Sequence, residues 1–276
     1  MRQARNAVEK PKKHAGAHAR QGIQSIEVGG RLLAALAASP KPMMLKDLAE
    51  AAGMSAPKAH RYLVSFQRMG LVEQDAASGH YDLGPFALDL GLASLGRLDP
   101  VQQALPALAR LRDAIDETVA LAVWGNHGAT IIRWLESSQT VNAALRTGAV
   151  MPLTRSATGR AFLAFMPDAA TAALAKAELA ANVRAGFAPA TREDMERVVA
   201  ETRRHGIARA VGEFTEAISG FAAPVFDADG RMTLALVALG YSGGFDSRWD
   251  GATARAVRDA AAQLSRRLGW SPARAA

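Results

Sequence analysis

The stretch DLAEAAGMSAPKAHRYLVSFQRMGLVEQDAASGHYDLG, residues 47–84 of this 276-residue chain, decides the fold. Its first half holds two short amphipathic segments separated by Gly53, a residue type that commonly ends a helix in the left-handed conformation. Ser55 is placed to cap the second of them. Its second half has two short alternating runs around Asp75–Gly79, which predicts a β-hairpin.

A further helix is predicted before this stretch, from Ser25 as its N-cap to about Ala38. Its apolar residues have helical spacing: Ile26, Leu33, Leu36 and Ala37. The pair Gly29-Gly30 should weaken it by about 1 kcal/mol per glycine relative to alanine. Three helices with a tight turn between the second and third, followed by a hairpin, indicate a winged helix-turn-helix.

The third helix has two chemically different sides. Successive helical residues turn by about 100°, which groups Ala59, Leu63 and Phe66 on one side and places cations opposite. Arginine suits guanine edges, whereas lysine and serine suit phosphate oxygens. We therefore predict double-stranded DNA as a partner, with contacts from Lys46, Ser55, Lys58, His60, Arg61, Ser65, Arg68 and His80. A merely solvated helix face, or a helix-turn-helix used only between proteins, remains the alternative.

Charge is unevenly distributed along the chain. The net charge is +7, and residues 1–21 carry six basic side chains against one acidic one, whereas residues 22–84 are formally neutral. We expect residues 1–21 to be a disordered basic tail that contacts phosphates through counterion release or only aids solubility. The absence of cysteine excludes disulfides and thiolate chemistry. No long apolar run or secretory signal is present, so we expect a cytoplasmic protein without a membrane partner.

Residues 85–98 form an apolar stretch with leucine at 88, 92 and 95. It predicts a linker helix between two domains, too apolar to stand alone in water. Packing against its copy in a second subunit would bury this surface. Packing on its own chain is the alternative.

Residues 99–270 change to mixed helix and strand and predict a second domain. Helices are expected near 105–115, 156–165, 169–179, 192–205 and 247–268. Strands are expected at 118–124, 129–135, 140–145, 207–211, 218–226 and 232–239. Hairpins with helices segregated around them indicate an α+β domain.

Catalytic chemistry has no positive support in the sequence. Nucleotide-binding glycine loops, the nucleophile elbow and the zinc-protease motif are absent. His14 and His18 have metal-like spacing, but accident in the tail explains it better, and Glu213 with Glu216 favours a solvated loop. We therefore predict no catalytic residue, no metal site and no cofactor.

The chain resembles the IclR family of bacterial transcription regulators from about Gln24 to Leu268. Four segments carry the resemblance in the first domain, at residues 47–55, 60–63, 70–72 and 81–84. Residues 152–164 and 222–227 carry it in the second. The resemblance implies a C-terminal GAF-like α/β effector domain, and a homodimer or dimer of dimers that responds to a small metabolite.

The same resemblance implies a set of effector-binding positions. They match Thr140, Ala143, Ala157, Thr158, Ala210, Ile218, Gly220 and Val237. Ala210, Gly220 and Val237 replace polar family residues, so the pocket should discriminate against a very small, fully polar acid. We hypothesise a larger, partly apolar effector, an aromatic or aliphatic acid, whose carboxylate is held by Thr158, Arg146 or Arg155. The alternative is that these small residues only pack.

Together these features predict a ligand-responsive regulator, not an enzyme, that binds an inverted-repeat operator as a homodimer or tetramer. The rival interpretation is an enzyme or sensor with an appended DNA-targeting module. It would need a nucleophile, metal site or cofactor loop in residues 99–276, and the sequence offers none.

Overall fold

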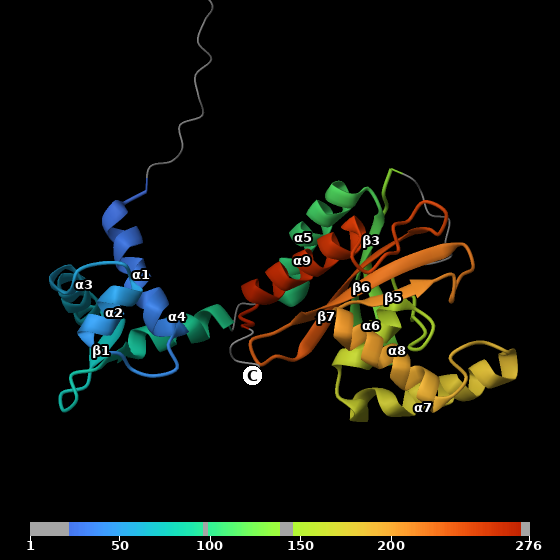
Figure 1. The fold of residues 1–276 in the computed structure, drawn as a ribbon, viewed down its shortest axis with the longest axis horizontal. Helices are drawn as coiled ribbons and strands as arrows, with labels where there is room; N and C mark the ends of the chain where they lie inside the picture. Colours follow the sequence, from blue (N-terminus) through green and yellow to red (C-terminus); the bar gives the residue numbers. More distant parts are fainter. Residues whose placement is uncertain (1–21, 96–98, 139–145, 272–276) are drawn as a thin grey trace, which may run out of the picture. The chain divides into compact units, whose positions relative to one another are not determined.

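The computed structural model describes residues 22–95, 99–138 and 146–271 (Figure 1). The chain forms two compact units, Met1–Arg97 and Leu98–Ala276. The predicted tail at 1–21, the end of the predicted linker helix and the predicted strand at 140–145 lie outside the described residues. The domain boundaries inferred from the sequence stay a prediction.

The first unit is a winged helix-turn-helix, as the sequence predicts. Three helices come first: α1 (Gln24–Ala38), α2 (Leu45–Ala51) and α3 (Ala56–Arg68). The strands β1 (Val72–Gln74) and β2 (Tyr81–Leu83) then pair antiparallel as the wing, and α4 (Pro85–Leu95) follows. Leu32, Leu48 and Leu63, one from each of the first three helices, are fully buried in a shared core.

Helix α1 differs in detail from its prediction. It begins at Gln24 after Ile23, so Ser25 lies inside the helix and does not cap it. Ile26 and Ala37 are exposed, and the buried line runs through Gly29, Leu32 and Leu36. A Cβ on Gly29 would lie 2.9 Å from Tyr62 Cδ1 and 3.0 Å from Phe66 Cζ. The close approach of α3 to this glycine therefore sets which side of α1 is buried.

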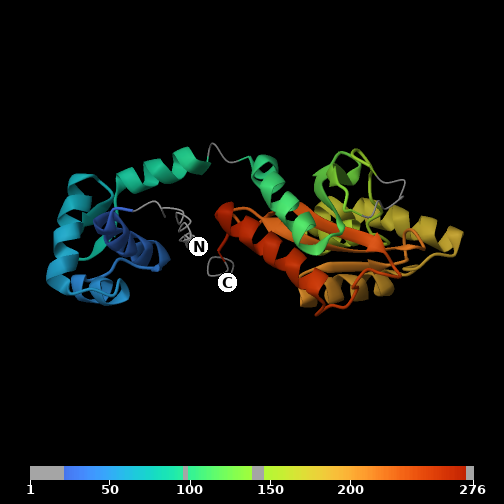
Figure 2. The same ribbon diagram turned by 90° about the horizontal axis from the view of Figure 1, so that it is seen from above.

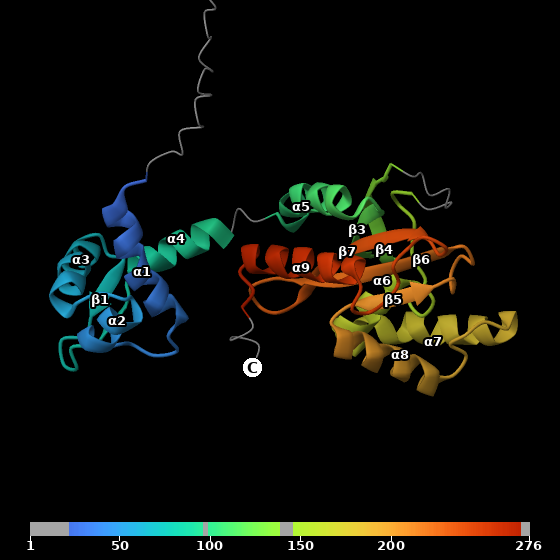
Figure 3. The same cartoon turned by 45° about the horizontal axis from the view of Figure 1, so that its top comes forward.

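The second unit is built on a five-stranded antiparallel sheet of order β4-β3-β7-β6-β5. Its strands are β3 (Thr118–Gly125), β4 (Gly128–Leu135), β5 (Ala208–Val211), β6 (Ile218–Phe226) and β7 (Met232–Tyr241). Helices α5 (Pro100–Ile115) and α9 (Ala252–Arg267) cover one face (Figure 2). Helix α6 (Ala157–Phe165) covers the other, backed by α7 (Asp168–Ala185) and α8 (Arg192–His205) (Figure 3).

Side chains alternate between two cores along the strands, as a sheet covered on both faces requires. On β7, Leu234 and Leu236 pack toward α5 and α9, whereas Ala235 and Val237 belong to the core beneath α6. The predicted α+β class is confirmed.

The closing helix starts five residues later than its sequence indicates. Helix α9 begins at Ala252 and not at Ser247. The Asp246 carboxylate accepts the Ala252 N–H at 3.1 Å and pairs with Arg248 at 2.9 Å, which holds the intervening residues in a turn. In the described ranges, no helix is both long and apolar enough to cross a membrane.

Candidate functional site

Helix α3 presents a polar face to solvent and an apolar face to the core. Ala59 and Leu63 are fully buried and Phe66 packs against the same cluster. The side chains predicted to contact DNA from this helix are all exposed: Lys58, His60, Arg61, Ser65 and Arg68. The two-sided arrangement predicted from the sequence is thus present.

The cations on this face are not engaged elsewhere. Arg61 and Arg68 form no side-chain hydrogen bond or ion pair with any residue that the structure describes. Ser65 Oγ donates to the Arg61 carbonyl oxygen at 3.3 Å. Ser55 occupies the N-cap position of α3, but its hydroxyl makes no capping hydrogen bond. That part of the prediction is wrong, and the hydroxyl stays exposed.

Two predicted DNA contacts lie outside α3. Lys46 is exposed in the first turn of α2, and His80 is half-buried at the end of the wing's turn. The His80 carbonyl oxygen accepts the Asp75 N–H at 2.9 Å. Hydrogen bonds from Ser78 hold the pKa of the Asp75 carboxyl below its ordinary value, so this turn is fixed by an ionised side chain.

A cavity in the second unit brings together the described residues that the sequence predicts to bind an effector. It is lined by Ala157 and Thr158 of α6, Ala210 of β5, Ile218 and Gly220 of β6, and Val237 of β7. Its volume is about 40 Å³. The other two predicted residues, Thr140 and Ala143, lie outside the described residues.

Free polar groups in this cavity gather at the first turn of α6. Ser156 caps the helix, with Oγ accepting the Gly159 N–H at 2.9 Å and donating to the Pro152 carbonyl oxygen at 2.7 Å. The N–H groups of Ala157 and Thr158 and the Thr158 hydroxyl have no partner among the described residues. Thr158 is only 2% exposed. Unpaired N–H groups at a helix N-terminus favour an anion.

The cavity has other lining residues that the sequence analysis did not predict, and the sequence pattern could have indicated one of them. Leu239 lies two residues after Val237 on β7, hence on the same face of the sheet, and it also lines the cavity. Phe214 and Thr215 line it from the loop between β5 and β6. A loop has no periodicity, so nothing in the sequence indicated them.

The arginines proposed to hold an effector carboxylate are not in the cavity wall. The Arg155 guanidinium lies 3.6 Å from the centroid of the Phe187 ring and donates to the Glu213 carbonyl oxygen at 2.6 Å. Arg146 is exposed and does not line the cavity. The hydroxyl and N–H groups of Thr158 are therefore the better candidates.

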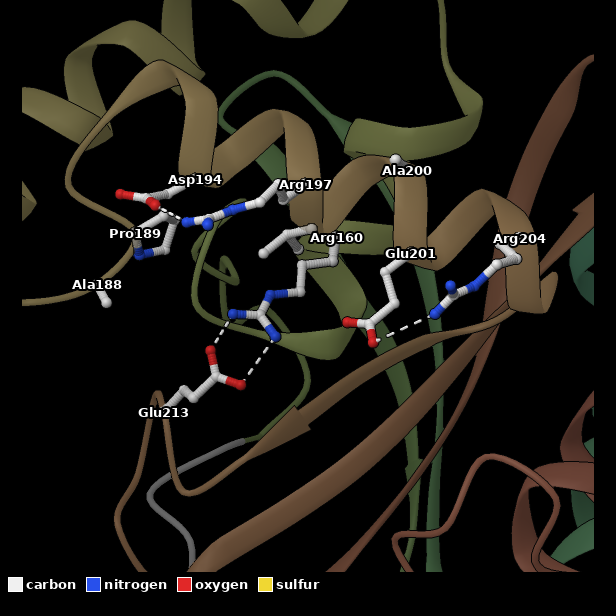
Figure 4. Close-up of a pocket in the computed structure, with 10 residues that line it drawn as sticks. Arg160, Ala188, Pro189, Asp194, Arg197, Ala200, Glu201, Arg204 and Glu213 are labelled. Atoms are coloured by element: carbon white, nitrogen blue, oxygen red, sulfur yellow. Dashed lines mark hydrogen bonds and ion pairs between the residues drawn. The ribbon is translucent and has the colours of Figure 1, made fainter.

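Glu213 differs in part from the sequence expectation, because it is a loop residue whose side chain is 38% exposed but is engaged in an ion pair. Its carboxylate pairs with the guanidinium of Arg160, a side chain only 6% exposed. This pair lies in the wall of a separate open cleft that also includes Pro189, Arg197 and Glu201 (Figure 4).

Two family models match the chain. The IclR helix-turn-helix domain matches residues 25–76, and the C-terminal domain of the bacterial transcriptional regulator IclR matches residues 92–266. The chain belongs to the IclR family. It is therefore a transcriptional regulator with a DNA-binding helix-turn-helix and a C-terminal effector domain.

Individual members of the IclR family match over nearly the whole chain. The glycerol operon regulatory protein of Streptomyces coelicolor is 32% identical over 254 residues, covering 90% of this chain and 98% of that protein. The crystal structure of Pseudomonas aeruginosa HmgR has a TM-score of 0.81 at 36% identity, covering 91% of this chain and all of HmgR. An IclR homolog from Microbacterium hydrocarbonoxydans, crystallised with 4-hydroxybenzoate, shares the fold at 21% identity and a TM-score of 0.50, covering 88% and 98%.

Metal chemistry has no candidate in the described part of this IclR-family chain. Within those residues, no three His, Cys, Asp or Glu side chains lie close enough together to hold an ion. The cavity wall, as described, contains no His, Cys, Asp or Glu.

Proposed function

We propose that this regulator binds an inverted-repeat operator as a homodimer or dimer of dimers, and that a partly apolar carboxylic acid in the α6 cavity controls it. The observation that carries the DNA-binding role is the exposed, unpaired cationic face of α3. A helix with one buried side and one free cationic side fits a major groove about 12 Å wide.

The side chains of this face divide by chemistry. Arg61 and Arg68 suit bidentate contacts with base edges, and Lys58 and Ser65 suit phosphate oxygens. Lys46, Ser55, His60 and His80 would contact the flanking backbone. Because residues 22–84 have no net charge, we expect modest affinity for random DNA.

Salt dependence tests whether these cations bind DNA at all. With operator fragments selected from genomic DNA, affinity should fall steeply with salt, by about 10³-fold or more between 50 and 200 mM if some six phosphates are contacted. A helix-turn-helix used only between proteins would yield no selected fragment and no such slope.

The apolar helix α4 supports the dimer. Leu88 and Leu92 are 62% and 58% exposed, and Asp89 is the one charged residue within Pro85–Leu95. A second copy of the chain would bury such a surface. Replacing both leucines with glutamine should lower the mass measured by light scattering to that of a monomer, and an unchanged mass would contradict this interface.

The α6 cavity supports an acid with an apolar body. A carboxylate would accept from the free N–H groups of Ala157 and Thr158 and from the Thr158 hydroxyl. Ile218, Val237 and Phe214 would contact the apolar part. Ala210, Gly220 and Val237 offer no polar side chain, so a small keto acid would be left with unpaired polar atoms, which is costly.

Calorimetry tests the effector class. The probes are 4-hydroxybenzoate, benzoate, hexanoate, pyruvate and glyoxylate, each titrated into the full-length protein and into Thr158→Val. We expect binding of one or more of the first three, weakened in the variant. Tight binding of only the two- and three-carbon keto acids would overturn this assignment.

The rival interpretation, an enzyme with a DNA-targeting module, is favoured by no observation on the described cavity, whose wall lacks a nucleophile paired with a base. We infer a regulator that is not an enzyme. Because its target is chromosomal DNA in bacteria, we also infer that it acts in the cytoplasm.

A further inference from the structure

The loop between β5 and β6 forms one wall of the effector cavity. Ala210 lies on β5 just before this loop, and Phe214 and Thr215 line the cavity from the loop itself. Two hydrogen bonds shape the loop internally: Gly212 N–H to the Ile218 carbonyl oxygen at 3.0 Å, and Ile218 N–H to the Thr215 carbonyl oxygen at 2.9 Å. Neither of them attaches the loop to α6.

Arg160 makes that attachment. It lies on α6, one helical turn after Ala157, and it is 5% exposed. Its Nη1 donates to Glu213 Oε1 at 2.9 Å, and its Nη2 pairs with Glu213 Oε2. Both interactions are drawn as dashed lines from Arg160 to the Glu213 carboxylate (Figure 4). Glu213 directly precedes Phe214, so the ion pair ties the cavity's loop to the helix on the opposite side.

The remaining donors of Arg160 keep its guanidinium in place. Nε donates to the Thr154 carbonyl oxygen at 2.8 Å, ahead of α6, and Nη1 also donates to the Arg209 carbonyl oxygen at 2.6 Å on β5. The Arg155 guanidinium adds a second bond to the loop, donating to the Glu213 carbonyl oxygen at 2.6 Å. An arginine bonded to two other segments, at the Thr154 and Arg209 carbonyl oxygens, is a rigid anchor for its third partner, the Glu213 carboxylate.

We propose that Arg160 is a positioning residue that fastens the loop carrying Phe214 over the effector cavity. The inference rests on the proposed function only in taking this cavity as the effector's site. Phe214 and Thr215 line the cavity from this loop, so the Arg160–Glu213 pair holds that part of the cavity wall in place.

The chain allows a test that needs neither an effector nor DNA, because it contains no cysteine. Ala210→Cys places a single thiol in the cavity wall, where Ala210 is 7% exposed. The rate of its reaction with 5,5′-dithiobis(2-nitrobenzoic acid) in the full-length protein measures how often the loop opens. Adding Arg160→Gln should raise this rate about tenfold or more, the change expected for losing charge-assisted hydrogen bonds that are partly buried.

A matched control is available in the same cleft. Arg197 pairs with Asp194, and both belong to α8, so Arg197→Gln removes an ion pair without touching the loop. Its labelling rate should equal that of the Ala210→Cys parent. If both arginine variants label at the parent's rate, the proposal is overturned.

A second variant removes the ion pair by changing its more exposed member, Glu213. It keeps the proposal testable if Arg160→Gln fails to fold. Glu213→Gln should raise the labelling rate as Arg160→Gln does, and the double variant should add nothing, because one interaction is lost in each case. Additive effects would contradict a shared ion pair. Failure of every acid in calorimetry would refute the effector class while leaving the labelling result unaffected, so the two failures are distinguishable.

Discussion

Helices α3 and α6 use arginine in opposite ways. On α3, Arg61 and Arg68 are exposed and form no side-chain hydrogen bond or ion pair with the described residues. On α6, every residue from 157 to 164 is buried, and Arg160 is bonded to two carbonyl oxygens and to Glu213. The free cations are available to a ligand outside the chain, whereas the bonded one holds the chain's own loop. Charge on a helix therefore indicates function only together with its burial and partners.

Replacing an arginine of each helix with methionine should give the largest difference between the two helices. Arg160→Met should lower the free energy of unfolding of the second unit by about 2–3 kcal/mol, because it leaves the Thr154 and Arg209 carbonyl oxygens without their donor. Arg61→Met should change stability by no more than about 0.5 kcal/mol. Urea unfolding followed by tryptophan fluorescence measures the first, since all four tryptophans lie after residue 98.

Hydrogen exchange of the α3 amides measures the effect of Arg61→Met on the first unit. Similar losses of stability in the two variants would show that the contrast between exposed and bonded arginine is wrong.

Operator binding should depend on the exposed arginine of α3 and not on an exposed arginine elsewhere in the chain. Arg61→Ala should weaken binding to a selected operator by about 1–3 kcal/mol if it contacts a base. Arg184→Ala is the matched control, because Arg184 is an exposed arginine near the end of α7 in the other unit. An electrophoretic shift assay that finds unchanged affinity for the Arg61 variant would reject its role.

The buried side of α3 can be examined through two adjacent glycines on α1. A Cβ on Gly29 would crowd Tyr62 and Phe66, whereas a Cβ on Gly30 would meet nothing within 4 Å. Gly30→Ala should therefore stabilise the first unit by up to about 1 kcal/mol, and Gly29→Ala should destabilise it by about 1 kcal/mol through overpacking. Hydrogen exchange of α1 and α3 measures both, and equal stabilisation by the two changes would contradict the close approach.

The smallest effect is expected next to α6. The Glu178 carboxylate accepts the N–H groups of Leu153 at 2.8 Å and Thr154 at 3.1 Å, in the segment that leads into this helix. Burial raises its pKa above the ordinary 4.5. The folded state then binds this proton more tightly than the unfolded state, so the contribution of Glu178 is full below pH 4.5 and is lost as pH rises through the raised pKa.

Glu178→Gln keeps an acceptor oxygen but removes the charge. Its free energy of unfolding should gain on the wild type as pH rises from 4 to 8, by less than the changes above. A variant whose free energy of unfolding gains on the wild type only toward low pH would contradict the raised pKa of Glu178.

The comparison also shows where sequence reasoning succeeds. The two sides of α3 follow from local periodicity, so the sequence predicts both the buried and the exposed residues. The pair of Arg160 and Glu213 joins side chains 53 positions apart, and the packing of α6 against β5 and β6 brings them together. The buried line of α1 was misplaced for a related reason, because it depends on the approach of Tyr62 and Phe66 from another helix.

The α6 cavity lies between these extremes. Positions such as Ala157 and Thr158 followed from the family resemblance, and Leu239 was accessible from strand alternation. Phe214 belongs to a loop held by tertiary contacts, which no local pattern encodes.

Selection from a random duplex library tests the central claim most directly, with full-length wild type and Arg61→Ala handled in parallel. The wild type should enrich an inverted repeat with half-sites about 10 base pairs apart, as two recognition helices in successive major grooves require. The variant should enrich the same repeat with preference lost at one symmetric pair of positions. An identical motif from both proteins, or no motif from the wild type, would contradict a DNA-reading role for α3.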